Sequence, residues 1–332
     1  MDVARWLLAA VLSLAFIGPA AYAQSDGQIA AQRAKGPVKP WRQVRGFGRV
    51  LDLSNLPLVI DEPGLYAIDR SWLIEQPSGV SELIQITADS VTLDLHGFEI
   101  SADIGPPGGT LFVISGRGVE IRNGGFSACC EEATAIRSTG FARLHHLSIF
   151  SGLTMDFANG TSLTDSLLSV RVEIQLAGNS KLERNTITCN RGRYCIRALG
   201  EGNRVTDNKL TLYQGGGIGI LGNRNLVVNN TVEAFEAPDA SEAFVVEGDI
   251  NVVRANTVIG GFEARSIFKI SGTANTLDGN VLAPPTPTAR ARIGMEFTAS
   301  GNYYGSNRMA AQVPFELGGT VQKDWGDNVG YD

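Results

Sequence analysis

The chain has 332 residues, of which 43% are hydrophobic but only 8% are aromatic, and its formal net charge is −6. This acidic balance argues against nucleic acid or an anionic membrane as the main partner. The 39 glycines fit short strands joined by tight turns. By length alone the chain would form about two ordinary domains, but a solenoid can use the same length as one elongated body.

The N-terminus has the pattern of a targeting signal. Arg5 precedes the apolar run 6–18, and small residues stand at Ala21 and Ala23, where a signal peptidase reads the chain. The run is too short to cross a bilayer, and no later stretch approaches about 18 apolar residues. We therefore predict a signal peptide over residues 1–23 that is removed near Ala23, and a secreted or periplasmic mature protein without a membrane span.

The segments on either side of the regular part of the chain are predicted to be a lead-in and two caps. Residues 24–48 carry Gly and Pro without periodicity, which predicts a flexible lead-in. Residues 49–85 contain short strands broken by a Pro-Gly turn, and we expect them to cap an open strand ladder. The regular pattern covers 86–305, and residues 306–332 are predicted to close the C-terminal end.

One short phrase recurs four times in the second half of the chain. Asn, any residue, an apolar residue, two further residues and Asn occupy 203–208, 225–230, 251–256 and 275–280, each after an apolar strand and a Gly. Repeats of this period indicate units that cannot close a core alone and must stack on their neighbours.

One turn residue per unit, which we call the anchor, marks the repeat along the chain. Anchors recur about every 23 residues, which is too short for a strand–helix unit and long enough for three strands and three turns. Aligned Asn side chains can donate to and accept from neighbouring turns, so we interpret these Asn residues as structural. The anchors are His96, Gly124, His146, Ser166, Asn185, Asn208, Asn230, Asn256, Asn280 and Asn302. The interior is predicted to hold Ile196, Ala198, Val205, Ile218, Ile220, Val227, Val246, Val253, Ile270 and Leu277.

These repeats carry a family resemblance. The phrase ITADSVTLDLHGF at 86–98 and the Asn-bounded repeats resemble the single-stranded right-handed parallel β-helix of the pectate-lyase-like superfamily, in particular its bacterial repeat proteins, over residues 50–305. The resemblance implies an all-β, right-handed parallel β-helix, a solenoid of about ten rungs with capping segments at both ends. It implies no single chemistry, because this scaffold hosts lyases, hydrolases, epimerases and non-catalytic binding proteins.

Four cysteines allow three disulfide connectivities in an oxidising compartment. Cys189 and Cys195 flank one loop and could close it, whereas the adjacent Cys129 and Cys130 could pair only in a strained ring. The sequence therefore also allows the four cysteines to be free thiols, or some of them free and some disulfide-bonded. Because no CxxC spacing occurs, we predict no zinc site and assign no metal ligands.

Extra length in each unit falls between an anchor and the next strand. These insertions occupy the same turn of successive units, so we expect them to project on one side and to wall a groove along the adjoining strand face. A long groove suits a polymer, and the resemblance implies a polysaccharide partner. The insertions are 127–133, 189–195, 212–217, 233–242 and 262–266.

The outward positions beside these loops suit an acidic sugar polymer. A polysaccharide lyase needs a base that removes the proton beside a uronate carboxylate, and a cation that neutralises this carboxylate. We predict Arg197 and Lys269 as the catalytic residues, and the chemistry leaves room for a divalent cation such as calcium as cofactor. The predicted substrate-binding residues, with Glu173 or Gln175 on the same face, are Arg137, Arg193, Tyr194, Tyr213 and Glu247.

The alternative is a non-catalytic carbohydrate-binding or cell-surface protein. In that interpretation the same residues form a solvated surface, on which Glu247 pairs with Lys269. An enzyme should bring Arg197 and Lys269 together in one pocket, whereas a binding protein should spread aromatic and polar groups along the groove.

Hydrolysis is disfavoured because a hydrolase needs paired carboxylates. We expect no acidic pair on the strand face, and the Asn-Thr-Asp, Asp-Asp and Gly-His-Gly signatures of polygalacturonase-like enzymes are missing. His145 stands beside the anchor His146, and we interpret His96 and His146 as turn residues. The acidic residues of the predicted loops are Glu131, Glu132, Glu233, Glu236, Asp239 and Glu242.

Overall fold

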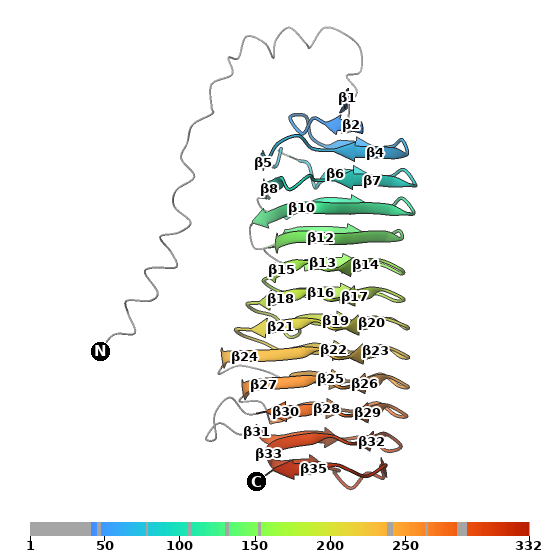
Figure 1. Ribbon diagram of the computed structural model, residues 1–332, viewed down its shortest axis with the longest axis vertical. Coiled ribbons are helices and arrows are strands. Elements are labelled where there is room, and N and C mark those ends of the chain that lie inside the picture. Colours follow the sequence, from blue (N-terminus) through green and yellow to red (C-terminus); the bar gives the residue numbers. More distant parts are fainter. Residues whose placement is uncertain are drawn as a thin grey trace, which may run out of the picture. The chain divides into compact units, whose positions relative to one another are not determined.

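The regular elements of the chain are strands, stacked one turn above another. In the computed structural model they form a parallel solenoid of about eleven turns within the compact unit Pro40–Asp332 (Figure 1). The prediction of an all-β, right-handed parallel β-helix is confirmed, and the predicted ten rungs are close to the observed number. The residues that the structure describes are 41–44, 48–77, 79–104, 108–129, 133–151, 154–237, 242–262, 265–283 and 291–331.

The predicted signal peptide 1–23 and residues 24–40 of the predicted lead-in lie outside the described residues. At the N-terminal end of the described chain, β1 (Trp41–Val44) and β2 (Gly48–Leu51) pair antiparallel, and β2 continues in parallel onto the coil. Within the described residues there is no candidate for a membrane-crossing helix.

Each turn of the coil contributes one strand to each of three faces. Strands of the first face pair in parallel with those of the turns before and after, as the register of β16, β19 and β22 shows. The strands of the first face are β3 (Leu58–Ile60), β6 (Glu82–Ile86), β9 (Thr110–Ile114), β11 (Thr134–Ser138), β13 (Thr154–Phe157), β16 (Glu173–Leu176), β19 (Ile196–Ala198), β22 (Ile218–Ile220), β25 (Phe244–Val246), β28 (Ser266–Ile270) and β31 (Ala291–Phe297).

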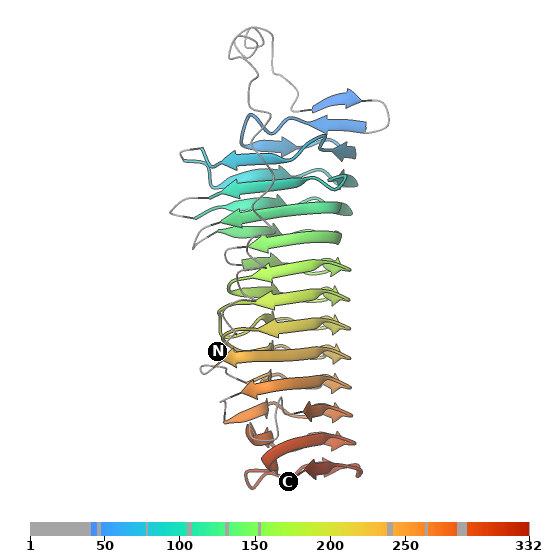
Figure 2. The same cartoon turned by 60° about the vertical axis from the view of Figure 1, so that its left-hand side comes forward.

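The second and third faces are built in the same way, and Figure 2 shows their strands superposed turn upon turn. The strands of the second face are β4 (Gly64–Ala67), β7 (Val91–Asp94), β14 (Ser162–Thr164), β17 (Lys181–Glu183), β20 (Arg204–Thr206), β23 (Leu226–Val228), β26 (Val252–Arg254), β29 (Thr276–Asp278), β32 (Tyr303–Gly305) and β34 (Lys323–Asp324). Those of the third face are β5 (Trp72–Glu75), β8 (Glu99–Asp103), β15 (Leu167–Val170), β18 (Thr186–Cys189), β21 (Lys209–Leu212), β24 (Thr231–Ala237), β27 (Thr257–Phe262), β30 (Val281–Ala283) and β35 (Val329–Tyr331).

Three longer strands pass from one face into the next. β10 (Val119–Cys129) and β12 (Ala142–Ser151) serve the second and third faces in one run, since β10 pairs with both β7 and β8. β33 (Arg308–Glu316) pairs with β30 at its start and with β31 further on.

The strands form because apolar and polar residues alternate, which places every second side chain in the interior. In β19, for example, Ile196 and Ala198 are fully buried and Arg197 between them points outward. The ten residues predicted to fill the interior are all 0% exposed, so that prediction is confirmed.

Two columns of buried asparagines hold successive turns in register. In the column between the second and third faces, the backbone N–H and the Nδ2 of Asn208 both donate to Oδ1 of Asn230, at 3.0 Å each. Asn230 makes the same two bonds to Asn256, also at 3.0 Å. In the column between the first and second faces, the backbone N–H of Asn225 donates to Oδ1 of Asn251 at 2.8 Å. Each Asn thus accepts hydrogen bonds from the Asn of the preceding turn and donates to the Asn of the following turn.

Three predicted anchors were misplaced. Asn302 belongs to the column between the first and second faces, since Asn275 donates its backbone N–H to Oδ1 of Asn302 at 3.0 Å. Asn280 donates instead to Asn307, which has the same five-residue spacing from Asn302 as the Asn pair of each repeat.

His96 and His146 stand one residue before the anchor position. The residue there has positive φ, 49° at His96 and 54° at His146, and His tolerates this left-handed conformation better than most residues do. At the true anchor position, Leu147 donates its backbone N–H to Oγ of Ser166 at 3.1 Å. The prediction therefore took each histidine for the anchor residue, although it stands at the left-handed position one residue earlier.

Candidate functional site

Four outward side chains on neighbouring strands of the first face lie in one row, which we call the outer strip. Arg137 of β11 is in register with Asp156 of β13, Asp156 with Gln175 of β16, and Gln175 with Arg197 of β19. Because parallel strands lie about 4.8 Å apart, the strip extends over about 14 Å from Arg137 to Arg197. It presents two guanidinium groups with a carboxyl group and an amide between them.

A second row of polar residues runs beside the strip, two positions before Asp156 and Gln175 and, because the register shifts in β11, three positions before Arg137. Thr134 and Thr154 lie with their hydroxyl oxygens 3.3 Å apart. Glu173 accepts a hydrogen bond from Nε2 of Gln175 at 2.5 Å, and its Oε1 lies 3.6 Å from Nη1 of Arg197. Glu173 is therefore held as the partner of Arg197.

The carboxyl group of Asp156 has a pKa above its ordinary value. Burial raises the pKa of its carboxyl group, and the charge of Arg137 opposes this effect without cancelling it. A carboxyl group whose pKa is moved toward neutrality can both accept and deliver a proton under ordinary conditions.

The two arginines of the strip are available to a ligand to different degrees. Arg137 is 45% exposed, with its Nη1 3.8 Å from Oε1 of Glu82. Arg197 is 36% exposed, and its buried Nε has no hydrogen-bond partner among the described residues. An unpaired buried donor is costly, so an acceptor supplied by a ligand would be favoured there.

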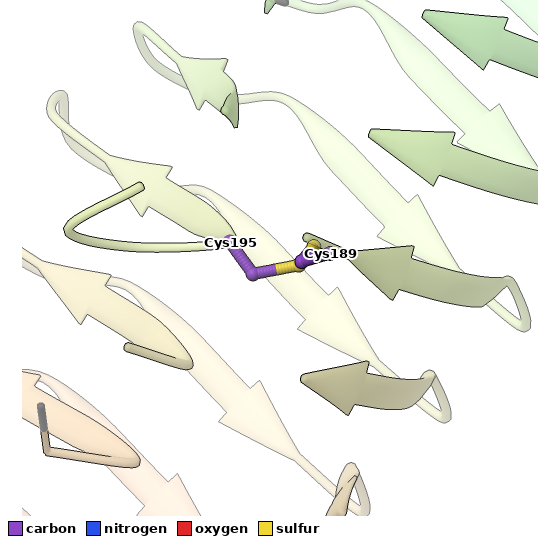
Figure 3. Close-up of a disulfide and its surroundings, with 2 residues drawn as sticks. All are labelled: Cys189 and Cys195. Carbon is purple, nitrogen blue, oxygen red and sulfur yellow. A yellow bond between two sulfur atoms is a disulfide. The ribbon is translucent and has the colours of Figure 1, made fainter. Parts of the chain in front are cut away.

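A disulfide-bonded loop closes one end of the strip. Cys189 at the end of β18 and Cys195 just before β19 form a disulfide, as Figure 3 shows. One of the pairings left open by the sequence is thereby settled, whereas Cys130 and the side chain of Cys129 lie outside the described residues.

Tyr194 of this loop lies against β22 at Gly219. A Cβ at Gly219 would meet Cγ of Tyr194 at 2.8 Å, and Tyr194 is only 2% exposed. The guanidinium carbon of Arg193 lies 5.2 Å from the centre of the Tyr194 ring. Burial raises the pKa of Tyr194, and the carboxylates of Glu242 and Glu247 act in the same direction.

Lys269 lies in the same row but far from Arg197. From Arg197 the row continues through Gly219, Val245 and Lys269, so the two cations are three strands, or about 14 Å, apart. Glu247 lies in the turn after β25, and no ion pair joins it to Lys269 in the described part of the chain.

The structure therefore brings together some of the predicted residues and separates others. Arg137, Arg197 and Tyr194 gather on the first face, with Arg193 stacked beside Tyr194. Lys269 lies three strands beyond Arg197, and Tyr213, which is 50% exposed, follows β21 on the loop side.

The expectation that no acidic pair lies on the strand face was wrong. Asp156 and Glu173 both point outward from neighbouring strands, β13 and β16. The alternation of TMDF at 154–157, with Met155 and Phe157 buried, marks Asp156 as an outward strand residue. The predicted acidic candidates, by contrast, all stand in the predicted loops.

The acidic residues of the predicted loops contribute little to the strip. Glu233 lies on β24 and pairs with Lys209 at 3.1 Å, on the third face. Glu242 approaches Tyr194, as noted above. Glu131, Glu132, Asp239 and the side chain of Glu236 lie outside the described residues.

The histidines lie on another face. Nε2 of His145 is 2.9 Å from Oε1 of Glu120, and Nδ1 of His145 is 2.8 Å from Nδ1 of His146. No group of three or more His, Cys, Asp or Glu side chains in the described residues has an arrangement that could hold a metal ion.

No family model and no curated protein matches the chain. Among solved structures it is similar to the A-module of the mannuronan C-5 epimerase AlgE4 of Azotobacter vinelandii, with 11% identity, 78% of this chain and 90% of that chain covered, and a TM-score of 0.46. It is also similar to the alginate lyase AlyF-OU02, with 14% identity, coverage of 93% and 59%, and a TM-score of 0.42. A third is the periplasmic alginate epimerase AlgG, with 12% identity, coverage of 90% and 81%, and a TM-score of 0.39.

The shared feature is the β-helix. With identities and TM-scores this low, we base the function on the residues of the chain itself.

Proposed function

We propose that the protein is a secreted or periplasmic β-helix protein that binds an acidic polysaccharide along the outer strip and cleaves it by β-elimination. The observation that carries this proposal is the row Arg137, Asp156, Gln175 and Arg197, in which two cations flank a half-buried carboxyl group with a raised pKa. Repeating uronate carboxylates suit such a row, because Arg binds carboxylates in bidentate fashion.

Three of the four residues of the strip have a role in the proposed reaction. Arg197, with its unpaired Nε, binds and neutralises the uronate carboxylate, which acidifies the neighbouring C5–H. The ionised form of Asp156 takes the C5 proton, a double bond forms between C4 and C5, and the C4–O bond to the leaving sugar breaks. Protonated Asp156 then returns the proton to the leaving oxygen. Arg137 binds a second carboxylate along the chain.

The remaining predicted residues take supporting roles in the proposal. Arg197 and Lys269 do not meet in one pocket as we expected of an enzyme, because they lie three strands apart. In the proposal Asp156 takes the place of Lys269 beside Arg197, and we reassign Lys269 from the catalytic centre to the surface beyond. Arg193 and Tyr194 border the strip at its closed end, and Tyr213 and Glu247 lie outside it.

A second reaction is favoured by one observation. Asp156 and Glu173 lie on adjacent strands and both point outward, so two carboxyl groups face the same surface, and burial raises the pKa of Asp156. Two such groups are what glycoside hydrolysis requires. A non-catalytic binding protein, the other alternative, would use the same strip without either reaction.

The test is an assay of the purified protein on polymannuronate, polyguluronate and polygalacturonate. Ultraviolet absorbance reports the unsaturated product of elimination, reducing ends without absorbance report hydrolysis, and retained binding without product reports a binding protein. Arg197→Ala and Asp156→Asn should each lower elimination at least about 100-fold, because each removes an interaction made in the transition state. Arg224→Ala is the matched control, since Arg224 is 67% exposed and pairs with Glu201 in a turn. Absence of binding and product on all three polymers would refute the proposal.

A further inference from the structure

The outer strip ends abruptly at Tyr194. The row of outward positions continues beyond Arg197 to Gly219, but the Tyr194 ring occupies the space above Gly219. Gly219 does not have a positive φ, so its backbone does not need glycine. The missing side chain instead makes room for the ring, which is held in place by the disulfide one residue away.

Between Tyr194 and Lys269 the surface offers a polyanion little to bind. Val245, the next outward position, is only 4% exposed. Glu296, in register with Lys269, is 7% exposed and pairs with Arg265 at 3.0 Å. The carboxylates of Glu242 and Glu247 approach the Tyr194 side chain and would repel uronate carboxylates. Sterics and charge therefore act in the same direction at this end of the strip.

We propose that Tyr194 is a specificity-determining residue that closes this end of the strip, so that a bound acidic polysaccharide runs along the strip from Arg137 and stops at Tyr194. This inference rests on the proposed function. Lys269, although it lies in the same row as Arg197, is cut off from the bound chain. An oligomer that extends past Tyr194 gains no contact with the protein at this end of the strip.

The test measures binding of hexamers of mannuronate, guluronate and galacturonate by calorimetry. Arg197→Ala should weaken binding of the preferred hexamer about 10-fold or more, as loss of a charged hydrogen-bonding partner does. Lys269→Ala should change it less than about twofold. In a Tyr194→Ala background the strip is open, so adding Lys269→Ala should then weaken binding about fivefold.

Tyr194→Phe is the matched control, because the ring and not the hydroxyl group fills the space above Gly219. It should behave as the wild-type protein does. Thermal unfolding of Tyr194→Ala checks that the loop change leaves the coil folded.

The outcomes separate the two proposals. If Lys269→Ala weakens hexamer binding in the wild-type protein as much as Arg197→Ala does, the strip is continuous and the closing role of Tyr194 is refuted while the proposed function stands. If no hexamer binds the wild-type protein, or if Arg197→Ala leaves hexamer binding unchanged, the proposed function fails, and the closing role of Tyr194 fails with it.

Discussion

The ring of Tyr194 fills the space that a side chain at Gly219 would need, since a Cβ there would lie 2.8 to 3.0 Å from three atoms of the ring. Gly219→Ala should therefore displace Tyr194 and lower the free energy of unfolding by about 1–3 kcal/mol, the usual cost of overpacking. Denaturant unfolding measures the loss. In a Tyr194→Ala background the same Ala should cost almost nothing, and an equal cost in both backgrounds would show that the clash lies elsewhere.

The Cys189–Cys195 disulfide should stabilise the protein modestly, because it closes a short loop with a sequence separation of 6. The chain-entropy relation gives about 2 kcal/mol for a loop of this size. Replacing both cysteines with Ser should lower the free energy of unfolding by that amount under oxidising conditions. The double variant should also lose the sensitivity to added reductant that the wild-type protein shows.

The same variant probes the boundary of the strip. Without the disulfide, Tyr194 is no longer tethered above Gly219, so Cys189→Ser/Cys195→Ser should respond to Lys269→Ala as Tyr194→Ala does. If Lys269→Ala leaves hexamer binding by the Cys189→Ser/Cys195→Ser variant unchanged, packing alone holds the Tyr194 ring in place.

The coil was predictable from sequence because its physics is local and repeated. Alternation in strands such as 196–198 selects the buried side chains, and the spacing from Asn203 to Asn208 recurs from turn to turn. The same regularity caused the error at Asn302, since both Asn columns carry the same residue at the same spacing. Asn307 stands five residues after Asn302, so the spacing itself assigns Asn302 to the column between the first and second faces and Asn307 to the other column.

The site was less predictable because it depends on neighbours across turns. Arg197 could be placed on an outward face, but its distance from Lys269 depends on counting turns correctly. The alternation at 154–157 could place Asp156 on an outward face, but the feature that suggests a function, a carboxyl group desolvated near Arg137, exists only after the turns have stacked. The contact of Tyr194 with Gly219 depends likewise on a loop reaching over the next turn.

Two asparagines of the column between the first and second faces, Asn225 and Asn251, are less completely hydrogen-bonded than those of the other column, and this predicts unequal mutational costs. Asn256 accepts two bonds from Asn230 and donates Nδ2 to the carbonyl of Val227 at 3.0 Å, whereas the Nδ2 groups of Asn225 and Asn251 have no partner in the described residues. Asn256→Ala should cost about 3 kcal/mol and Asn251→Ala about 1 kcal/mol, since only the former leaves several buried groups unpaired. Denaturant unfolding compares the two, and equal costs would contradict this explanation.

Asp156 and Asp94 should affect stability with opposite dependence on pH. Burial raises the pKa of Asp156 in the folded state, so its ionised form destabilises the protein above that pKa, and this cost disappears as the pH falls below the unfolded value of about 3.9. Asp94 is also desolvated, but hydrogen bonds from the backbone N–H of His96 and from Arg122 and Asn123 outweigh burial and lower its pKa. Its stabilisation is present above about pH 3.9 and is lost as the pH falls through the lowered folded-state pKa.

Asp156→Asn should therefore raise the midpoint of thermal unfolding at neutral pH, and the gain should vanish in acid. Asp94→Asn should lower the midpoint at neutral pH, and that loss should also shrink in acid. Unfolding from pH 3 to pH 8 measures both differences against the wild-type protein. A stabilised Asp156→Asn that has lost its reaction would mean that this carboxyl group is retained for chemistry at the expense of the fold, whereas a destabilised one would assign it a structural role.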